Sequence, residues 1–272
     1  MPAVNIVQAV VLGLVQGITE FLPISSTAHL RITPAVAGWP DAGAAYTAVL
    51  QLGTLVAVVG FFLRDLLSML QAVLDPARRN GPEARRLLYM IVGTIPVGVA
   101  GLLFKHAIEG PLRSLSVIAT SLIVVGLLMA VVEKVAPHRR GIDDITLRDA
   151  LLIGCAQALA LIPGTSRSGI TLVAAMALGL RRDAAAKFSF LLSVPAIAAA
   201  GIFELPKVLK TPNLAGAPLV VGLLVAAVSG YLSIAWLLRF LRTRTTMPFV
   251  VYRVAMGAAL LLAIASGWLR NA

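Results

Sequence analysis

The chain alternates between long apolar stretches and short polar loops. A helix that crosses a bilayer needs about 20 apolar residues, and six stretches come close to this length: residues 44–63, 88–105, 116–135, 188–204, 217–238 and 249–269. Two further apolar regions, 5–37 and 149–180, are interrupted by prolines and polar residues. This pattern predicts two short helices around a polar break, a pair that can enter a membrane, turn and leave on the same side where protein or water covers its backbone. We therefore predict six transmembrane helices and two re-entrant helical hairpins.

The composition agrees with a membrane protein. Hydrophobic residues make up 59% and charged residues 13% of the 272 residues, and the mean hydropathy is +0.92, whereas about a quarter of an average soluble domain is charged. Aromatic residues are few, and the chain lacks the alternating segments of about ten residues that are typical of membrane β-barrels. The expected fold class is an all-α polytopic membrane protein with a single integral membrane domain, residues 1–272.

Two smaller features of the chain complete this prediction. The N-terminal apolar run has no basic residues before it and contains Gln8, Gln16 and Glu20, so it does not predict a cleaved signal peptide. Cys155, the single cysteine, lies in an apolar stretch and is expected to be a small core residue.

The basic residues act as topology signals. A formal net charge of +11 would suggest nucleic-acid binding in a soluble protein, but these residues lie in short loops between apolar runs, so no nucleic-acid partner is expected. If the first hairpin starts outside, one face collects Arg64, Arg78, Arg79, Arg85, Arg86, Lys134, Arg139, Arg140, Arg148, Arg181, Arg182, Lys187, Arg239, Arg242 and Arg244. The opposite face collects Arg31, Lys105, Arg113, Lys207, Lys210 and Arg270. The excess predicts that the first face is cytoplasmic; much of it would vanish if either hairpin crossed the membrane fully.

The two halves of the chain, roughly residues 1–135 and 149–272, resemble each other. LGLVQGITEFLPISST at 12–27 aligns with IGCAQALALIPGTSRS at 153–168, and YTAVLQLG at 46–53 aligns with FSFLLSVP at 188–195. One half starts outside and the other in the cytoplasm. The sequence therefore predicts an inverted-topology repeat whose broken segments meet near the midplane of the membrane.

Glu20 and Arg167 place charges within the two breaks. A charged side chain in the hydrocarbon region costs at least about 2.5 to 3.5 kcal/mol, so such residues are commonly functional. Their opposite signs favour either a direct ion pair or a shared ligand. The alternative is a purely structural salt bridge that locks the hairpins together.

Hydroxyl side chains surround both charges: Ser25, Ser26, Thr27, Thr165, Ser166 and Ser168. Helices are predicted to begin after Pro23 and Pro163, and a helix N-terminus offers free N–H groups and partial positive charge. Together with Arg167, two such termini would form an anion site, most naturally for phosphate. The hydroxyls also suit plain N-capping, which leaves the arginine unexplained.

Two spacings suggest catalytic chemistry. Gln16 and Glu20 are four residues apart on one helical face, where their oxygens could hold a hard divalent cation together with substrate phosphate oxygens. Ser26 and His29 are three residues apart on an opening turn, which would let the imidazole act as general base for the hydroxyl. A surface or capping role is the alternative for this histidine. The combination is typical of metal-assisted phosphoryl transfer.

QGITEFLPISSTAH at 16–29 and PGTSRSG at 163–169 resemble the two signature regions of the undecaprenyl-diphosphatase family, bacterial membrane phosphatases of the bacitracin-resistance type. The resemblance extends over essentially the whole chain. It implies hydrolysis of undecaprenyl diphosphate to undecaprenyl phosphate and phosphate at the outer side of the bacterial cytoplasmic membrane, which recycles the lipid carrier for peptidoglycan synthesis. It also implicates Glu20, Ser26, His29 and Arg167 in catalysis, with a divalent cation, Mg or Ca. Many members have Glu where this chain has Gln16, although the family's pattern admits Gln, so the ion is expected either to bind more weakly here or to depend on Glu20 and the diphosphate.

A secondary transporter or flippase of an anionic lipid phosphate is the alternative function, because inverted repeats with broken helices are also typical of alternating access. Ser26 near His29 favours the enzyme, since a transporter needs no nucleophile and base. The expected partners are undecaprenyl diphosphate and membrane lipids. The sequence leaves the oligomeric state open, a homodimer included.

Overall fold

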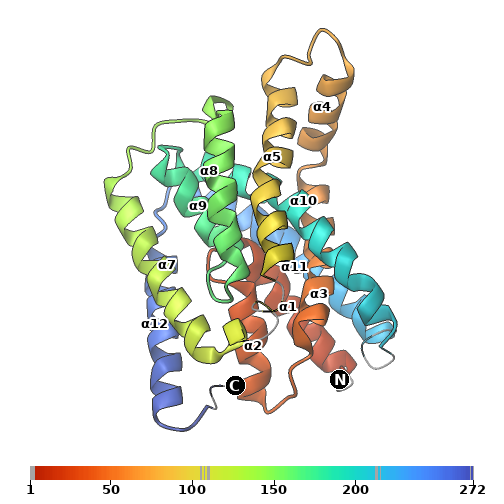
Figure 1. The fold of residues 1–272 in the computed structure, drawn as a ribbon, viewed down its shortest axis with the longest axis vertical. Coiled ribbons are helices and arrows are strands. Elements are labelled where there is room, and N and C mark those ends of the chain that lie inside the picture. The colour runs from red at the N-terminus through yellow and green to blue at the C-terminus, as the bar shows by residue number, and fades with distance from the viewer. Residues whose placement is uncertain are drawn as a thin grey trace.

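A computed structural model describes residues 4–104, 106, 108, 111–211, 214, 216–269 and 271. Its helices are α1 (Ile6–Phe21), α2 (Ser26–Ala37), α3 (Gly43–Phe61), α4 (Leu63–Leu74), α5 (Pro82–Leu103), α7 (Leu115–Val135), α8 (Leu147–Ala158), α9 (Arg167–Ala177), α10 (Arg182–Leu209), α11 (Ala217–Leu241) and α12 (Met247–Ala265) (Figure 1). Single 3-10 turns occur at Pro111–Arg113, Ile142–Asp144 and Leu159–Leu161. Within the described residues there is no β-strand, which confirms the all-α prediction.

Six helices among the described residues are long and apolar enough to cross a membrane: α3, α5, α7, α10, α11 and α12. They coincide with the six predicted stretches. Helix α10 extends beyond the predicted 188–204 at both ends, and its first turns include the buried helix formers Ala184, Ala185 and Ala186. Helix α4 lies in a segment that is predicted to be a connecting loop. The prediction misses it because the run is too short to span a membrane and polar positions separate its exposed leucines.

The loops predicted to be cytoplasmic lie together at one end of the molecule, the upper end in Figure 1. The upper part of the picture holds the α4–α5 connection, the last turn of α7 and the first turns of α8 and α10. The start of α1, the α2–α3 connection and the last turns of α10 and α12 lie at the other end. The two sets of predicted loops are thus separated along the long axis. Lys105 and Arg270 belong to the second predicted set and lie outside the described residues.

Both interrupted regions form two short helices around a break, as their sequences predict. Helix α1 packs against α2, and α8 packs against α9. Helices α2 and α9 begin at Ser25 and Ser166, whose φ angles of 77° and 72° lie in a region that non-glycine residues seldom adopt. Each serine Oγ accepts the backbone N–H three residues on, from Ala28 at 3.4 Å and from Gly169 at 3.1 Å. The predicted N-capping is confirmed, and it holds both breaks in an unusual backbone conformation.

The packing of the two halves follows one pattern. Helix α1 packs on α11 as α8 packs on α5, while α3 meets α10 and α7 meets α12. Glycine makes the first two contacts close: a Cβ added at Gly17 would lie 1.9 Å from the Ser229 Oγ, and one at Gly154 would lie 2.3 Å from the Gly93 carbonyl oxygen. Small residues at such contacts let membrane helices approach backbone to backbone. The short helices are therefore held rigidly against long ones.

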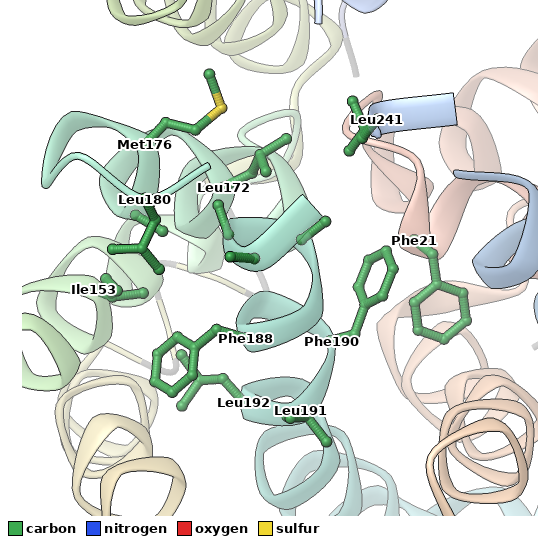
Figure 2. Close-up of a cluster of buried hydrophobic side chains, with 14 of the residues drawn as sticks. Phe21, Ile153, Leu172, Met176, Leu180, Phe188, Phe190, Leu191, Leu192 and Leu241 are labelled. Atoms are coloured by element: carbon green, nitrogen blue, oxygen red, sulfur yellow. The ribbon is translucent and has the colours of Figure 1, made fainter. Parts of the chain in front are cut away.

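The largest apolar core surrounds α9 and the first half of α10 (Figure 2). Phe21, at the end of α1, meets Phe190 of α10 edge to face with ring centroids 5.2 Å apart. Leu172 and Met176 of α9 and Ile153 of α8 belong to the same cluster. Because this core includes the end of α1, Ile24 of the first break, and residues of both α8 and α9, it fixes where the two breaks lie relative to each other.

Cys155 corrects one expectation. It lies exposed on α8 rather than in the core. The buried face of α8 is formed instead by Ala150, Ile153, Gly154 and Gln157, so the cysteine falls on the opposite face of the helix.

Candidate functional site

The carboxylate of Glu20 is the centre of a buried polar cluster. It lies on the last turn of α1 with its side chain 4% exposed. One oxygen, Oε1, accepts a hydrogen bond from Arg167 Nη2 at 2.7 Å. The other, Oε2, accepts from Ser26 Oγ at 2.6 Å and from Gln16 Nε2 at 2.8 Å. The structure therefore joins the two charged residues of the breaks directly, across 147 positions of the chain.

Hydrogen bonds between the two breaks hold this cluster together. Ser168 Oγ donates to the Leu22 carbonyl at 3.1 Å, and the Gly164 N–H points at Thr27 Oγ1 at 3.5 Å. Arg167 is the first residue of α9, and Ser26 is the first residue of α2. The N-termini of both helices therefore converge on one guanidinium and one hydroxyl, an arrangement that favours an anion.

A cavity of about 290 Å³ opens from this cluster. Six of the predicted site residues line it: Glu20, Ser25, Ser26, Thr27, Ser166 and Arg167. Gln16, His29, Thr165 and Ser168 are not among its lining residues. Gln16 instead donates to Glu20, and Ser168 donates to the Leu22 carbonyl. The Thr165 carbonyl accepts from Arg253, as described below.

The cavity extends toward the lower end of the molecule in Figure 1. Its lining there comes from α2, the start of α3, the turn before α7 and the last part of α10. Arg31 and Arg113 line this part. Asp41 accepts from Arg113 Nη2 at 3.0 Å and lies 3.7 Å from Arg31 Nε. The opening therefore carries charges of both signs, since Glu204 of α10 lines it as well, while most of the remaining wall is apolar.

His29 and Ser26 form hydrogen bonds with other residues and not with each other, unlike the direct pair that the spacing predicts. Its Nδ1 lies 2.7 Å from the Ser25 carbonyl oxygen, and its Nε2 lies 2.6 Å from the Tyr252 hydroxyl. Because a carbonyl oxygen can only accept, Nδ1 carries the hydrogen, and in the neutral ring Nε2 accepts from the tyrosine. Ser26 points toward α1 and α9 from the start of the helix, whereas His29 points toward α12. A spacing of three places two residues near one face of a helix. Here Ser26 nevertheless meets Glu20 of α1, and His29 meets Tyr252 of α12.

Arg253 was left unassigned by the charge pattern, and the structure gives it five partners. It is fully buried in α12, and its guanidinium donates to backbone carbonyls only. Nη1 donates to Pro23 in the first break at 3.0 Å, and Nη2 donates to Gly164 and Thr165 in the second break at 3.0 Å each. The remaining contacts are to Leu122 and Ser121 of α7. The available signal was an arginine inside an otherwise apolar span.

The donor atoms around Glu20 suit a cation only in part. No group of three or more His, Cys, Asp or Glu side chains that could hold a metal occurs among the described residues. Both Glu20 oxygens accept hydrogen bonds, and Gln16 turns its NH₂ group toward the carboxylate. The carbonyl oxygen of Gln16 is buried and has no partner in the described part of the chain. With its amide turned over, Gln16 could offer that oxygen to a cation beside Glu20.

Comparison with known proteins gives a consistent family. The sequence model of the family described as bacitracin resistance protein BacA matches residues 9–259. An undecaprenyl-diphosphatase of Myxococcus xanthus is 55% identical over 97% of this chain and 90% of its own length. Proteins of the same name from Nocardioides sp. and Synechococcus elongatus are 49% and 50% identical, over 97% of this chain and 98% and 95% of their own lengths. The chain therefore belongs to the BacA family of bacitracin resistance proteins.

Proposed function

We propose that this protein hydrolyses undecaprenyl diphosphate to undecaprenyl phosphate and inorganic phosphate. The observation that carries the proposal is the Glu20–Ser26–Arg167 cluster, placed where two helix N-termini meet in a cavity among apolar helices. Full-length relatives named for this hydrolysis support it, and they favour the enzyme over a transporter. Such an activity would return the lipid carrier to peptidoglycan synthesis and account for bacitracin resistance.

In the proposed reaction, the terminal phosphate of the lipid lies against the N-termini of α2 and α9. The Arg167 guanidinium, which now pairs with Glu20, turns its fork to two phosphate oxygens. Oε1 of Glu20 then loses its ion pair with Arg167 and would be the oxygen available to a divalent cation, while Oε2 accepts the proton of the Ser26 hydroxyl that is already hydrogen-bonded to it. If a water held by Ser26 attacks the terminal phosphorus, inorganic phosphate forms directly; if the serine oxygen itself attacks, a phosphoserine forms, and a water then hydrolyses it to release inorganic phosphate and restore the hydroxyl. The bond from this phosphorus to the bridging oxygen breaks, and the lipid monophosphate leaves.

His29 has an orienting role in this proposal. Its ring links the Ser25 carbonyl to Tyr252, and so it ties the strained start of α2 to α12. A direct role as proton acceptor for Ser26 would need the ring to leave both partners. In this proposal Glu20 accepts the proton of Ser26, and His29 maintains the backbone conformation at the start of α2.

A divalent cation, Mg or Ca, belongs to the same proposal. Glu20 and the turned amide of Gln16 would hold it, with the substrate phosphate completing its shell, since Mg²⁺ is commonly bound by one or two carboxylates and phosphate oxygens. When bound, it neutralises charge that develops on the phosphate.

Gln16→Glu is expected to lower the metal concentration needed for half-maximal activity, because it adds a carboxylate four residues from Glu20 on the same face of α1. Metal titrations of phosphate release for both proteins measure this. Gln8→Glu, at the start of the same helix, is the matched control and should change nothing. An unchanged half-saturation in Gln16→Glu would remove this residue from the cation site.

We infer that the lower end of the molecule in Figure 1 is the outer side of the cytoplasmic membrane and that both hairpins are re-entrant within an inverted repeat. The positions of the basic loops and the matching helix contacts of the two halves support this arrangement. The cavity then faces outward, where Arg31 and Arg113 at its mouth are available to an anionic headgroup.

Single cysteines in place of Asn80 and Lys210, in a Cys155→Ala background, test this topology. Both positions are exposed; Asn80 lies in the α4–α5 connection and Lys210 directly follows α10, and these two segments lie at opposite ends of the molecule. We expect a membrane-impermeant thiol reagent to label position 210 in intact cells and position 80 only after the membrane is opened. Labelling of both from one side would contradict the re-entrant arrangement.

The proposed activity is tested directly with purified protein in detergent. Undecaprenyl diphosphate, or farnesyl diphosphate as a soluble substitute, is supplied with and without a chelator, and free phosphate is measured. We expect release that depends on the cation and on Glu20. Release no greater than that of a Glu20→Gln variant would contradict the proposal.

A further inference from the structure

Gln157 is a polar residue of the cavity for which the proposed reaction has no role. It lies on the last turn of α8 and is fully buried. Its side chain lines the same cavity as Glu20, Ser26 and Arg167. Neither its Nε2 nor its Oε1 has a hydrogen-bond partner among the described residues. Both halves of one amide are therefore left without a partner beside the cluster.

The comparison with Gln16 makes this unusual. In the alignment of the two halves, Gln16 and Gln157 occupy the same position. Gln16 donates to Glu20 at 2.8 Å and points at Thr54 Oγ1 at 3.4 Å. The aligned positions in the second half are Leu161 and Ala196, which offer no side-chain acceptor. The second half thus keeps the amide and lacks the groups that accept from its NH₂ in the first.

A buried amide without partners lowers stability, because it has given up its hydrogen bonds to water. Leucine has a similar size and carries no such cost at an apolar site. A group that lowers the stability of the folded protein and lines a cavity is commonly explained by a ligand that satisfies it. In this cavity, the ligand must accept hydrogen bonds from an NH₂ group and fit beside a guanidinium and two helix N-termini.

We propose that Gln157 binds the diphosphate headgroup of the substrate, with Nε2 donating to a phosphate oxygen and Oε1 accepting from water bound to the headgroup. The inference rests on the proposed function, since it takes the ligand of the cavity to be a lipid diphosphate. An amide suits this role because Arg167 already supplies the charge. The amide adds direction without adding a further charge to an apolar cavity, and it does not exchange protons in the reaction.

The test uses full-length Gln157→Leu with exposed Gln71→Leu on α4 as the matched control. Three quantities are measured in the same detergent: thermal unfolding, the affinity for inorganic diphosphate, and KM and kcat for farnesyl diphosphate. Gln157→Leu should unfold at the wild-type temperature or above it, because it removes the unsatisfied amide. Its affinity for inorganic diphosphate should fall and its KM should rise by about tenfold to a hundredfold, as for a lost hydrogen bond to a charged group. Gln71→Leu should match the wild type.

Other results overturn the inference in distinct ways. Unchanged affinity for diphosphate in a folded Gln157→Leu protein would show that the Gln157 amide does not contact the ligand. A lower unfolding temperature with normal affinity per folded molecule would make it structural; Gln157→Met, which has a flexible apolar side chain, repeats the measurement if leucine prevents folding. If the wild type binds inorganic diphosphate but releases no phosphate from the lipid, the proposed hydrolysis fails, and the affinity comparison still decides on Gln157. A wild type that neither binds diphosphate nor releases phosphate from the lipid would overturn both.

Discussion

Glu20→Gln and Ser26→Ala are each expected to lower kcat by about a thousandfold or more, and the double variant is expected to fall little further. The reason is that one hydrogen bond, from Ser26 Oγ to Glu20 Oε2 at 2.6 Å, joins the attacking oxygen to its proton acceptor. Groups that serve a single step are strongly non-additive, because removing either one stops the step that both assist. Glutamine keeps the size of the side chain, but it cannot take the proton.

Phosphate release per folded molecule measures this, with folding followed by thermal unfolding in the same detergent. His29→Ala is the informative comparison, since His29 contacts Ser25 and Tyr252 rather than Ser26. Its loss should combine multiplicatively with that of Ser26→Ala if it only orients the start of α2. Multiplicative losses for Glu20 with Ser26, together with non-additive losses for His29 with Ser26, would return the role of base to His29.

The positions of the long helices could be predicted from the sequence because a bilayer imposes a simple rule of length and polarity on each segment. The breaks could be found because Pro23, Pro163 and their serines interrupt apolar runs that are otherwise continuous. The pairing of Glu20 with Arg167 followed from the same logic, since two opposite charges in apolar surroundings stabilise each other. These features depend on local composition or on charge.

The partners of individual side chains could not be predicted in the same way. His29 and Ser26 are close in sequence, yet Tyr252 and Glu20 reach them from α12 and α1. Gln157 resembles Gln16 in sequence, and only the packed structure shows that it lacks the partners of Gln16. Such differences depend on which side chains other helices bring to each face, and helical periodicity contains no information about that.

Arg253 is the residue for which this limit matters most. The charge pattern assigned it no role, and the structure shows five carbonyl partners in three separate segments: the two breaks and α7. A planar guanidinium with five N–H groups can satisfy carbonyls in several directions at once. Since Arg253 does not line the cavity, we infer that it positions the breaks and does not touch the substrate.

Arg253→Met is accordingly expected to lower the free energy of unfolding by about 3 kcal/mol or more. Methionine fills most of the space, but it leaves several buried carbonyls without a donor, and each such group costs about 1 to 3 kcal/mol. The folded fraction should also lose activity, because the N-termini of α2 and α9 would no longer be held against each other at Glu20 and Arg167. Arg253→Lys should recover only part of both losses, since an ammonium group reaches fewer of the five carbonyls.

Exposed Arg244→Met near the start of α12 is the control for loss of one positive charge and should behave as the wild type. Thermal unfolding and phosphate release per folded molecule separate the two effects. A fully stable Arg253→Met protein with normal KM and kcat would show that the breaks keep their geometry without this residue, and that the core around Phe21 and Phe190 is sufficient to hold them.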